Sequence, residues 1–124
     1  MVASQEELQN EIAKAQQLQQ QLQNVLSQKQ QMEIKKNDLE RALEEIKDLE
    51  EDTPMYRNVG ENILIKVEDR GKLIEDLEEQ VESTEVRLKS FSRQEEKLRN
   101  NFQELQKELS AKLSGVQPGP QTGG

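Results

Sequence analysis

Apolar residues recur at intervals of three and four along two long polar segments, residues 5–50 and 70–113. This seven-residue repeat, written abcdefg with the apolar positions at a and d, predicts two amphipathic helices that pack as a coiled coil. In the first segment the a and d positions hold Leu8, Glu11, Ala15, Leu18, Leu22, Val25, Lys29, Met32, Lys36, Leu39, Leu43 and Ile46. In the second they hold Ile74, Leu77, Val81, Thr84, Leu88, Phe91, Glu95, Leu98, Phe102, Leu105, Leu109 and Lys112. Because the segments are nearly equal in length, we expect them to fold back on each other as an antiparallel pair.

Local signals mark where each helix begins and ends. Ser4 and Glu7 have the spacing of a capping box, so the first helix is expected to start directly after Ser4. Pro54 stops this helix a few residues earlier, because the residue before a proline is pushed out of the helical region. Asp69 is the expected N-cap of the second helix, and residues 114–124 are expected to form a disordered tail.

The a and d residues of the two helices form an apolar seam, and each facing pair of these residues makes one layer of it. Charged residues interrupt this seam at several layers. In the antiparallel pairing, Lys29 and Glu95 lie one layer apart and can form an ion pair across the seam. Such a polar layer fixes the helix register at some cost in stability.

The seam deteriorates at the end far from the connecting loop. There the charged Glu11 and Lys112 take seam positions, and the apolar Ile12 and Leu113 lie beside the seam at e positions. We therefore expect a loosely zipped end with apolar groups close to water. Two interpretations of this end stay open: ordinary fraying of a coiled coil, or a weak binding surface for other apolar segments.

Residues 54–67 are the only internal stretch without helical periodicity. Strand-forming residues flank Gly60, which predicts a β-hairpin with its turn at Gly60–Glu61 and a second strand from Asn62 to Val67. The second strand is apolar on both faces, and leaving its four apolar side chains in water would forfeit roughly 6–12 kcal/mol. An isolated hairpin is marginal in water, so we expect other chains to cover it. The residues expected to mediate this assembly are Tyr56, Val59, Ile63, Leu64, Ile65 and Val67.

Composition narrows the class of protein further. The chain has 124 residues, of which 31% are hydrophobic, 2% aromatic and 34% charged, too little apolar material for an ordinary globular core. It contains no Cys or His, so nucleophilic triads and thiolate or imidazole metal sites have no candidates. Exposed carboxylates on two helices lack the concave, partly dry site that catalysis needs. We therefore expect no catalytic residues, metal or cofactor.

Charge and hydropathy also bear on partners and location. The net charge of −8 argues against nucleic acid as the main partner, although residues 87–99 are locally basic. Neither a signal peptide nor a membrane-length apolar run is recognisable, which predicts a soluble cytoplasmic protein without a membrane partner. The Gln-rich stretches 16–23 and 28–31 are interpreted as helix-compatible surface.

The arrangement of two matched helices around one hairpin, residues 5–113, resembles a subunit of prefoldin. The stretch YRNVG at 56–60, followed by ILIK at 63–66, is similar to that family's aromatic-x-x-V-G-x-x-apolar-L-V/I-K hairpin. One hairpin per chain is the pattern of the beta class, and the general character resembles the archaeal type. The alpha class carries two hairpins and is longer. The resemblance implies a single domain over 1–124, mainly α, with a long antiparallel two-helix coiled coil and one central β-hairpin that assembles into an inter-subunit β-barrel.

The resemblance also implies a function. Two alpha and four beta chains would form a hexameric, ATP-independent holdase that holds unfolded client proteins between coiled-coil tips and passes them to a group II chaperonin. By position, the resemblance assigns client contact to Leu8, Ile12, Phe102, Leu105, Leu109 and Leu113.

Two other classes of function fit parts of the pattern. The chain could be a structural coiled-coil adaptor or tether that oligomerises through the hairpin. It could also be a helical arm that grips RNA, against which the net charge of −8 counts.

Overall fold

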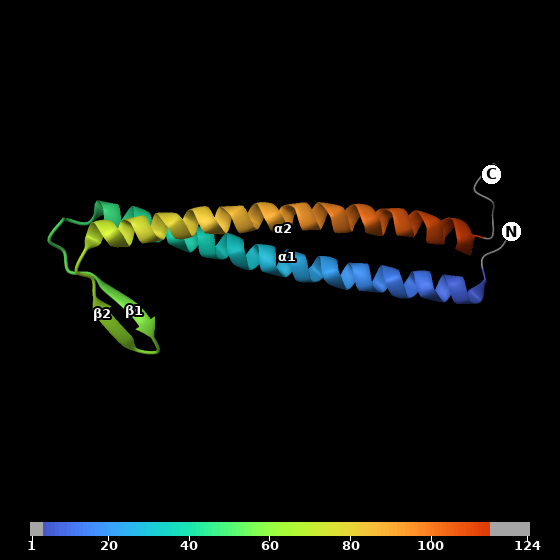
Figure 1. Cartoon of the computed structure of the whole chain (residues 1–124), viewed down its shortest axis with the longest axis horizontal. Coiled ribbons are helices and arrows are strands. Elements are labelled where there is room, and N and C mark those ends of the chain that lie inside the picture. The colour runs from blue at the N-terminus through green and yellow to red at the C-terminus, as the bar shows by residue number, and fades with distance from the viewer. Residues whose placement is uncertain (1–3, 115–124) are drawn as a thin grey trace. The chain divides into compact units, whose positions relative to one another are not determined.

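The computed structural model describes residues 4–114 and contains two helices and one two-stranded sheet. Helix α1 spans Gln5–Asp48, strand β1 Tyr56–Gly60, strand β2 Ile63–Lys66 and helix α2 Arg70–Leu113 (Figure 1). The mainly α fold class with a central antiparallel hairpin is therefore confirmed. Of the tail expected at 114–124, only Ser114 lies within the described residues.

The chain divides into two compact units, and both helices contribute to each. We call residues 1–29 and 90–124 the terminal unit, and residues 30–89 the hairpin unit. The terminal unit contains the first part of α1 and the last part of α2. The hairpin unit contains the rest of both helices together with β1 and β2.

Ion pairs show that the helices run antiparallel within each unit. In the terminal unit, the Lys29 Nζ lies 2.9 Å from Glu95 Oε1, as the sequence predicted, and Lys112 pairs with Glu11. In the hairpin unit, Lys36 Nζ lies 3.6 Å from Glu85 Oε2 and Lys47 Nζ lies 3.9 Å from Glu78 Oε2.

The heptad assignment accounts for burial along both helices. Every a and d position between Leu8 and Ile46, and between Ile74 and Lys112, is buried or half-buried. The most buried apolar side chains are Val25, Leu43, Leu105 and Leu109. Thr84, the most buried polar residue, satisfies its hydroxyl by donating to the carbonyl of Gln80 at 2.7 Å.

The expectation of a loosely zipped seam at this end is wrong, although Ile12 and Leu113 beside the seam are exposed to water as expected. Leu105 and Leu109 are only 7% and 8% exposed, so the seam is closed close to the C-terminus of α2. The charged seam residues that were expected to weaken it, Glu11 and Lys112, form an ion pair with each other across the helices. Charges in adjacent layers thus compensate each other, which a layer-by-layer view of the sequence overlooks.

Side-chain caps begin both helices. The Ser4 Oγ accepts from the Glu7 backbone N–H at 3.0 Å, and the Asp69 Oδ1 accepts from the Lys72 N–H at the same distance. Each cap satisfies one of the amides that the first turn of a helix leaves unpaired. These are the caps that the sequence predicted.

Arg70, the first residue of α2, caps the other end of α1. Its guanidinium donates to the carbonyl oxygens of Glu50 at 2.8 Å, of Leu49 at 2.9 Å and of Ile46. The last carbonyls of a helix have no partner within it and carry partial negative charge, so a cation is well placed there. One side chain therefore ties the end of α1 to the beginning of α2.

The hairpin turn lies one residue later than predicted. β1 pairs with β2 in antiparallel register, with Arg57 opposite Ile65 and Asn58 opposite Leu64, and Val59 forms an irregularity before Gly60. Glu61 and Asn62 form the turn, and Asn62 has a φ of 60°. Gly60 instead ends β1, and its backbone N–H donates to Asn58 Oδ1 at 3.2 Å. Asparagine tolerates the left-handed region better than most residues, which explains its place in the turn.

Candidate functional site

The hairpin exposes the apolar side chains that the sequence predicted for assembly. Ile63, Leu64 and Ile65 are 55%, 64% and 53% exposed, and Tyr56 and Val59 are also more than half exposed. Every residue of both strands is exposed, so neither face of the sheet is covered by other residues of the described range 4–114.

Val67 differs from the other predicted assembly residues because it is half-buried. With Ile65 and Leu73 it lines a shallow depression at the start of α2, and Lys66, Lys72 and Asp76 contribute charged groups to the same depression. The Val67 backbone N–H donates to the Met55 carbonyl at 2.9 Å and extends the pairing of the two strands. Val67 thus joins the exposed hairpin to the helix.

The six residues predicted for client contact all lie in the terminal unit, but they differ in accessibility. Ile12 and Leu113 are 40% and 63% exposed, Leu8 and Phe102 are half-buried, and Leu105 and Leu109 are buried in the seam. Only Ile12 and Leu113 therefore offer large apolar surface to a partner while the two helices stay packed.

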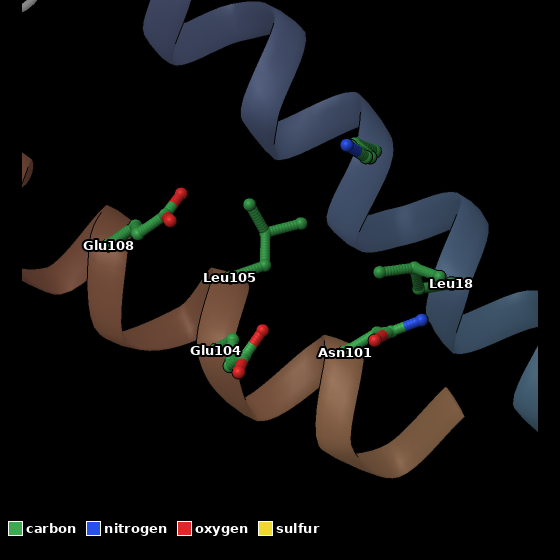
Figure 2. A pocket seen from close by; sticks show the side chains of 6 residues that line it. Leu18, Asn101, Glu104, Leu105 and Glu108 are labelled. Carbon is green, nitrogen blue, oxygen red and sulfur yellow. The ribbon is translucent and has the colours of Figure 1, made fainter. Parts of the chain in front are cut away.

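A groove in the terminal unit, which the sequence analysis did not identify, has the seam as its floor. Leu18 of α1 and Leu105 of α2 point toward each other, and Asn101, Glu104 and Glu108 stand along its α2 side (Figure 2). Lys14 lines it from α1. A second depression has Val25 and Leu98 at its centre, with Gln21, Asn24, Gln94, Lys97 and Asn101 around them. The polar residues around both depressions occupy g and c heptad positions. Both depressions therefore lie on the same flank of the coiled coil, the one formed by the g and c positions.

Two ionisable groups in the seam have shifted pKa values. Hydrogen bonds from Lys29 and Arg99 hold the pKa of the Glu95 carboxyl below its ordinary value of 4.5, with Arg99 Nε 2.9 Å from Glu95 Oε2. The hydrogen bond to Glu11 raises the pKa of Lys112 above 10.5. Both shifts favour the charged forms, as expected for ion pairs.

Two further exposed apolar residues were also missed from the sequence. Ile34 and Val86 are 54% and 67% exposed, and both occupy f positions, which face away from the seam. The heptad assignment itself contained this signal, since an apolar f residue has no place in a two-helix seam. Both belong to the hairpin unit.

Neither a metal centre nor a membrane span is present among residues 4–114. No group of three or more His, Cys, Asp or Glu side chains in that range could hold a metal ion. Within the same described range, neither α1 nor α2 is apolar enough over its length to cross a lipid bilayer.

Comparison with known proteins places these features in a family. Residues 9–115 match the model of the prefoldin subunit family. A prefoldin subunit beta of Archaeoglobus fulgidus is 46% identical over 87% of this chain and 91% of its own length, and one of Methanothrix thermoacetophila is 38% identical over 90% and 92%. The crystal structure of the prefoldin beta subunit from Thermococcus strain KS-1 superposes with a TM-score of 0.76 at 32% identity, covering 95% of this chain and 99% of that one. The chain therefore belongs to the beta class of the prefoldin subunit family, whose members are chaperone subunits that assemble with other prefoldin subunits.

Proposed function

We propose that this chain is one of four beta subunits that combine with two alpha subunits into an ATP-independent holdase. The holdase binds non-native polypeptides at the terminal units and transfers them to a group II chaperonin. The cytoplasmic location expected from the sequence belongs to the same proposal. The observation that carries it is an exposed apolar hairpin in a chain of the prefoldin family.

The hairpin supports the assembly part of this proposal. Its exposed side chains on both faces would lose roughly 1.5–3 kcal/mol each if they stayed in water. Both strands also have a free edge, and such an edge pairs readily with a strand of another chain. Pairing between hairpins would satisfy both needs at once, and a barrel formed by several chains would leave no free edge.

The terminal unit supports the client part. Ile12 and Leu113 offer exposed apolar surface at equivalent e positions, and Leu8 and Phe102 extend it at half-buried positions. Leu105 and Leu109 would reach a client only if α1 and α2 separated locally. A surface of this size binds weakly, so several chains on one body would be needed to supply avidity.

The native mass of the complex purified from its own cells tests the assembly part. A six-chain complex with a longer, two-hairpin subunit is the expected result. A homodimer, or a complex with one unrelated protein, would instead favour the structural adaptor. As a direct check, Ile63→Asp should release monomers, because the carboxylate would be buried between chains; an unchanged native mass would contradict this assignment.

Suppression of aggregation tests the client part. The double variant Ile12→Ser with Leu113→Ser should keep its assembly and hold chemically denatured protein less well. Ile34→Ser with Val86→Ser is the matched control, because it removes from the hairpin unit two apolar groups that are at least as exposed. Equal protection by the two double variants would show that the terminal unit has no special role.

A further inference from the structure

One flank of the terminal unit carries no charge over residues 5–23 and 103–113, although the whole chain has a net charge of −8. Glu96 and Arg99, which lie outside these ranges, are the charged residues of the same flank. On α1, the b and e positions of this flank hold Gln5, Gln9, Ile12, Gln16, Gln19 and Gln23. On α2, they hold Gln103, Gln106, Ser110 and Leu113. All these side chains are exposed. We call this surface the amide face.

The sidedness of the coiled coil places these residues together. The grooves described above are surrounded by g and c residues of both helices, such as Lys14 with Glu108 and Gln21 with Gln94. In an antiparallel pair the g and c positions of both helices share one flank, so the b and e positions share the opposite one. Over residues 5–23 and 103–113, glutamines, Ser110 and two apolar residues therefore lie on the b and e flank, and the groove flank carries charged residues; Glu96 and Arg99 lie earlier along α2.

The glutamines of the amide face are available for binding. Within residues 4–114, none of their side chains has a hydrogen-bond partner. Each glutamine amide has one oxygen that can accept from a backbone N–H and an NH₂ group that can donate to a backbone carbonyl. In a native protein nearly all backbone groups are already paired, whereas an extended non-native segment leaves them free.

We propose that the amide face binds the backbone of extended, uncharged polypeptide segments, with Ile12 and Leu113 as apolar anchors. This inference rests on the proposed holdase function and names the part of the client that is recognised. A surface without charge favours uncharged segments, because a charged segment would lose hydration there and gain no ion pair in exchange. Recognition of backbone groups does not depend on the client's sequence. It also excludes folded proteins more sharply than apolar contact alone, because their backbone groups are already paired.

Backbone N-methylation tests the proposal on the assembled complex. The probes are an end-capped fluorescent peptide of Ala, Val, Ser and Asn, and the same peptide N-methylated at alternate residues, which removes donors and keeps the side chains. The complex should bind the unmethylated peptide about fivefold more tightly or better, in proportion to the hydrogen bonds lost. Equal affinity for the two peptides would overturn the proposal. So would a complex that holds denatured protein but binds neither peptide.

Paired variants assign the effect to one flank. Gln16→Glu with Gln19→Glu should weaken binding of the unmethylated peptide about threefold to tenfold, since each change removes donors and adds charge. Gln17→Glu with Gln21→Glu adds the same charge to the groove flank of the same helix and should change affinity less than about twofold. Equal losses from the two pairs would overturn the proposal, as would a changed native mass in the first pair, which would assign the face to contact between subunits.

A third variant separates amide recognition from plain hydrophobicity. Gln16→Met with Gln19→Met keeps side-chain length and removes the hydrogen-bonding groups, so it should also weaken binding several-fold. Tighter binding would mean that the face acts by apolar contact alone. Failure of the holdase function itself gives a different result: the wild-type complex would then neither bind these peptides nor suppress aggregation of denatured protein.

Discussion

The Nζ of Lys29 lies 2.9 Å from the Oε1 of Glu95, so the ion pair joins α1 and α2 inside their apolar seam. Arg99, one turn further along α2, donates to the other oxygen of the same carboxylate at 2.9 Å. Both Glu95 oxygens are therefore engaged, and its side chain is only 17% exposed.

This arrangement predicts a pH-dependent contribution to stability. The pKa of Glu95 is lowered in the folded state, mainly by the hydrogen bond from Lys29, so the stabilisation is full above the ordinary value of 4.5. It is lost as the pH falls through the lowered pKa. Thermal unfolding of the complex followed by circular dichroism should show Glu95→Gln less stable than wild type near neutral pH, with the difference shrinking in acid. Glu96→Gln, at an exposed neighbouring position, is the control and should show no such trend.

The ion pair of Glu11 and Lys112 predicts that a single and a double variant change the stability of the complex in opposite directions. Lys112→Leu alone should lower the urea midpoint of the complex, because it leaves a carboxylate in the seam whose Oε2 is already buried without a partner among residues 4–114. Glu11→Leu with Lys112→Leu should raise the midpoint above wild type, because an apolar pair replaces a partly buried ion pair. A double variant less stable than the single one would contradict this account.

The same pair also predicts behaviour at alkaline pH. The hydrogen bond to Glu11 raises the pKa of Lys112, so its contribution is complete below 10.5 and is lost as the pH rises through the higher folded value. The urea midpoint of Lys112→Leu should therefore approach that of wild type in strongly alkaline buffer. Lys107→Leu, at an exposed position, should show no convergence.

The Arg70 cap predicts a local loss of order at the C-terminus of α1. Arg70→Ala should destabilise the complex by about 1–3 kcal/mol, because three carbonyls lose a charged donor. Hydrogen exchange should accelerate in the last turn of α1. Arg41→Ala, at an exposed position of the same helix, is the control and should leave exchange there unchanged. Equal exchange in both variants would show that the cap contributes nothing.

In the hairpin turn an asparagine, and not the neighbouring glycine, adopts a positive φ, so substitutions at the asparagine should matter more. Asn62, not Gly60, has a positive φ, of 60°, so Asn62→Gly should be neutral or stabilising and Asn62→Val should cost about 1–2 kcal/mol. Gly60→Ala should be tolerated, because the added Cβ would meet Ile63 Cδ1 at an ordinary 3.6 Å. Thermal unfolding of the three variants checks this order, and a larger loss in Gly60→Ala than in Asn62→Val would contradict it.

Much of this fold could be predicted from hydrophobic periodicity. The heptad positions identified both helices and every half-buried seam residue, because burial in a two-helix coiled coil depends on little else. The pairing of Lys29 with Glu95 followed from the same register. The exposed apolar hairpin could be predicted as well, since the seam uses most of the apolar residues of both helices and the sequence showed no other segment to cover the side chains of β2.

Other features depended on three-dimensional detail that periodicity does not carry. Glu11 and Lys112 come from adjacent layers and pair with each other, so their charges do not disrupt the seam in the way that was expected when each layer was considered separately. Arg70 reaches carbonyls that lie at least 20 residues earlier in the chain, and a long side chain can reach many acceptors from one position. The uncharged stretch of one flank was present in the sequence, but it becomes a surface only when the b and e positions of the two helices are combined.

The hairpin has a consequence for the supply of this subunit in the cell. A newly made chain without partners displays Ile63, Leu64 and Ile65 to water, the same kind of surface that marks a damaged protein for degradation. Unpaired copies should therefore be short-lived, and the amount of this chain should follow the amount of its partners. The strands that build the complex would then also limit the amount of unassembled subunit, because only copies whose hairpins are covered by partners would persist.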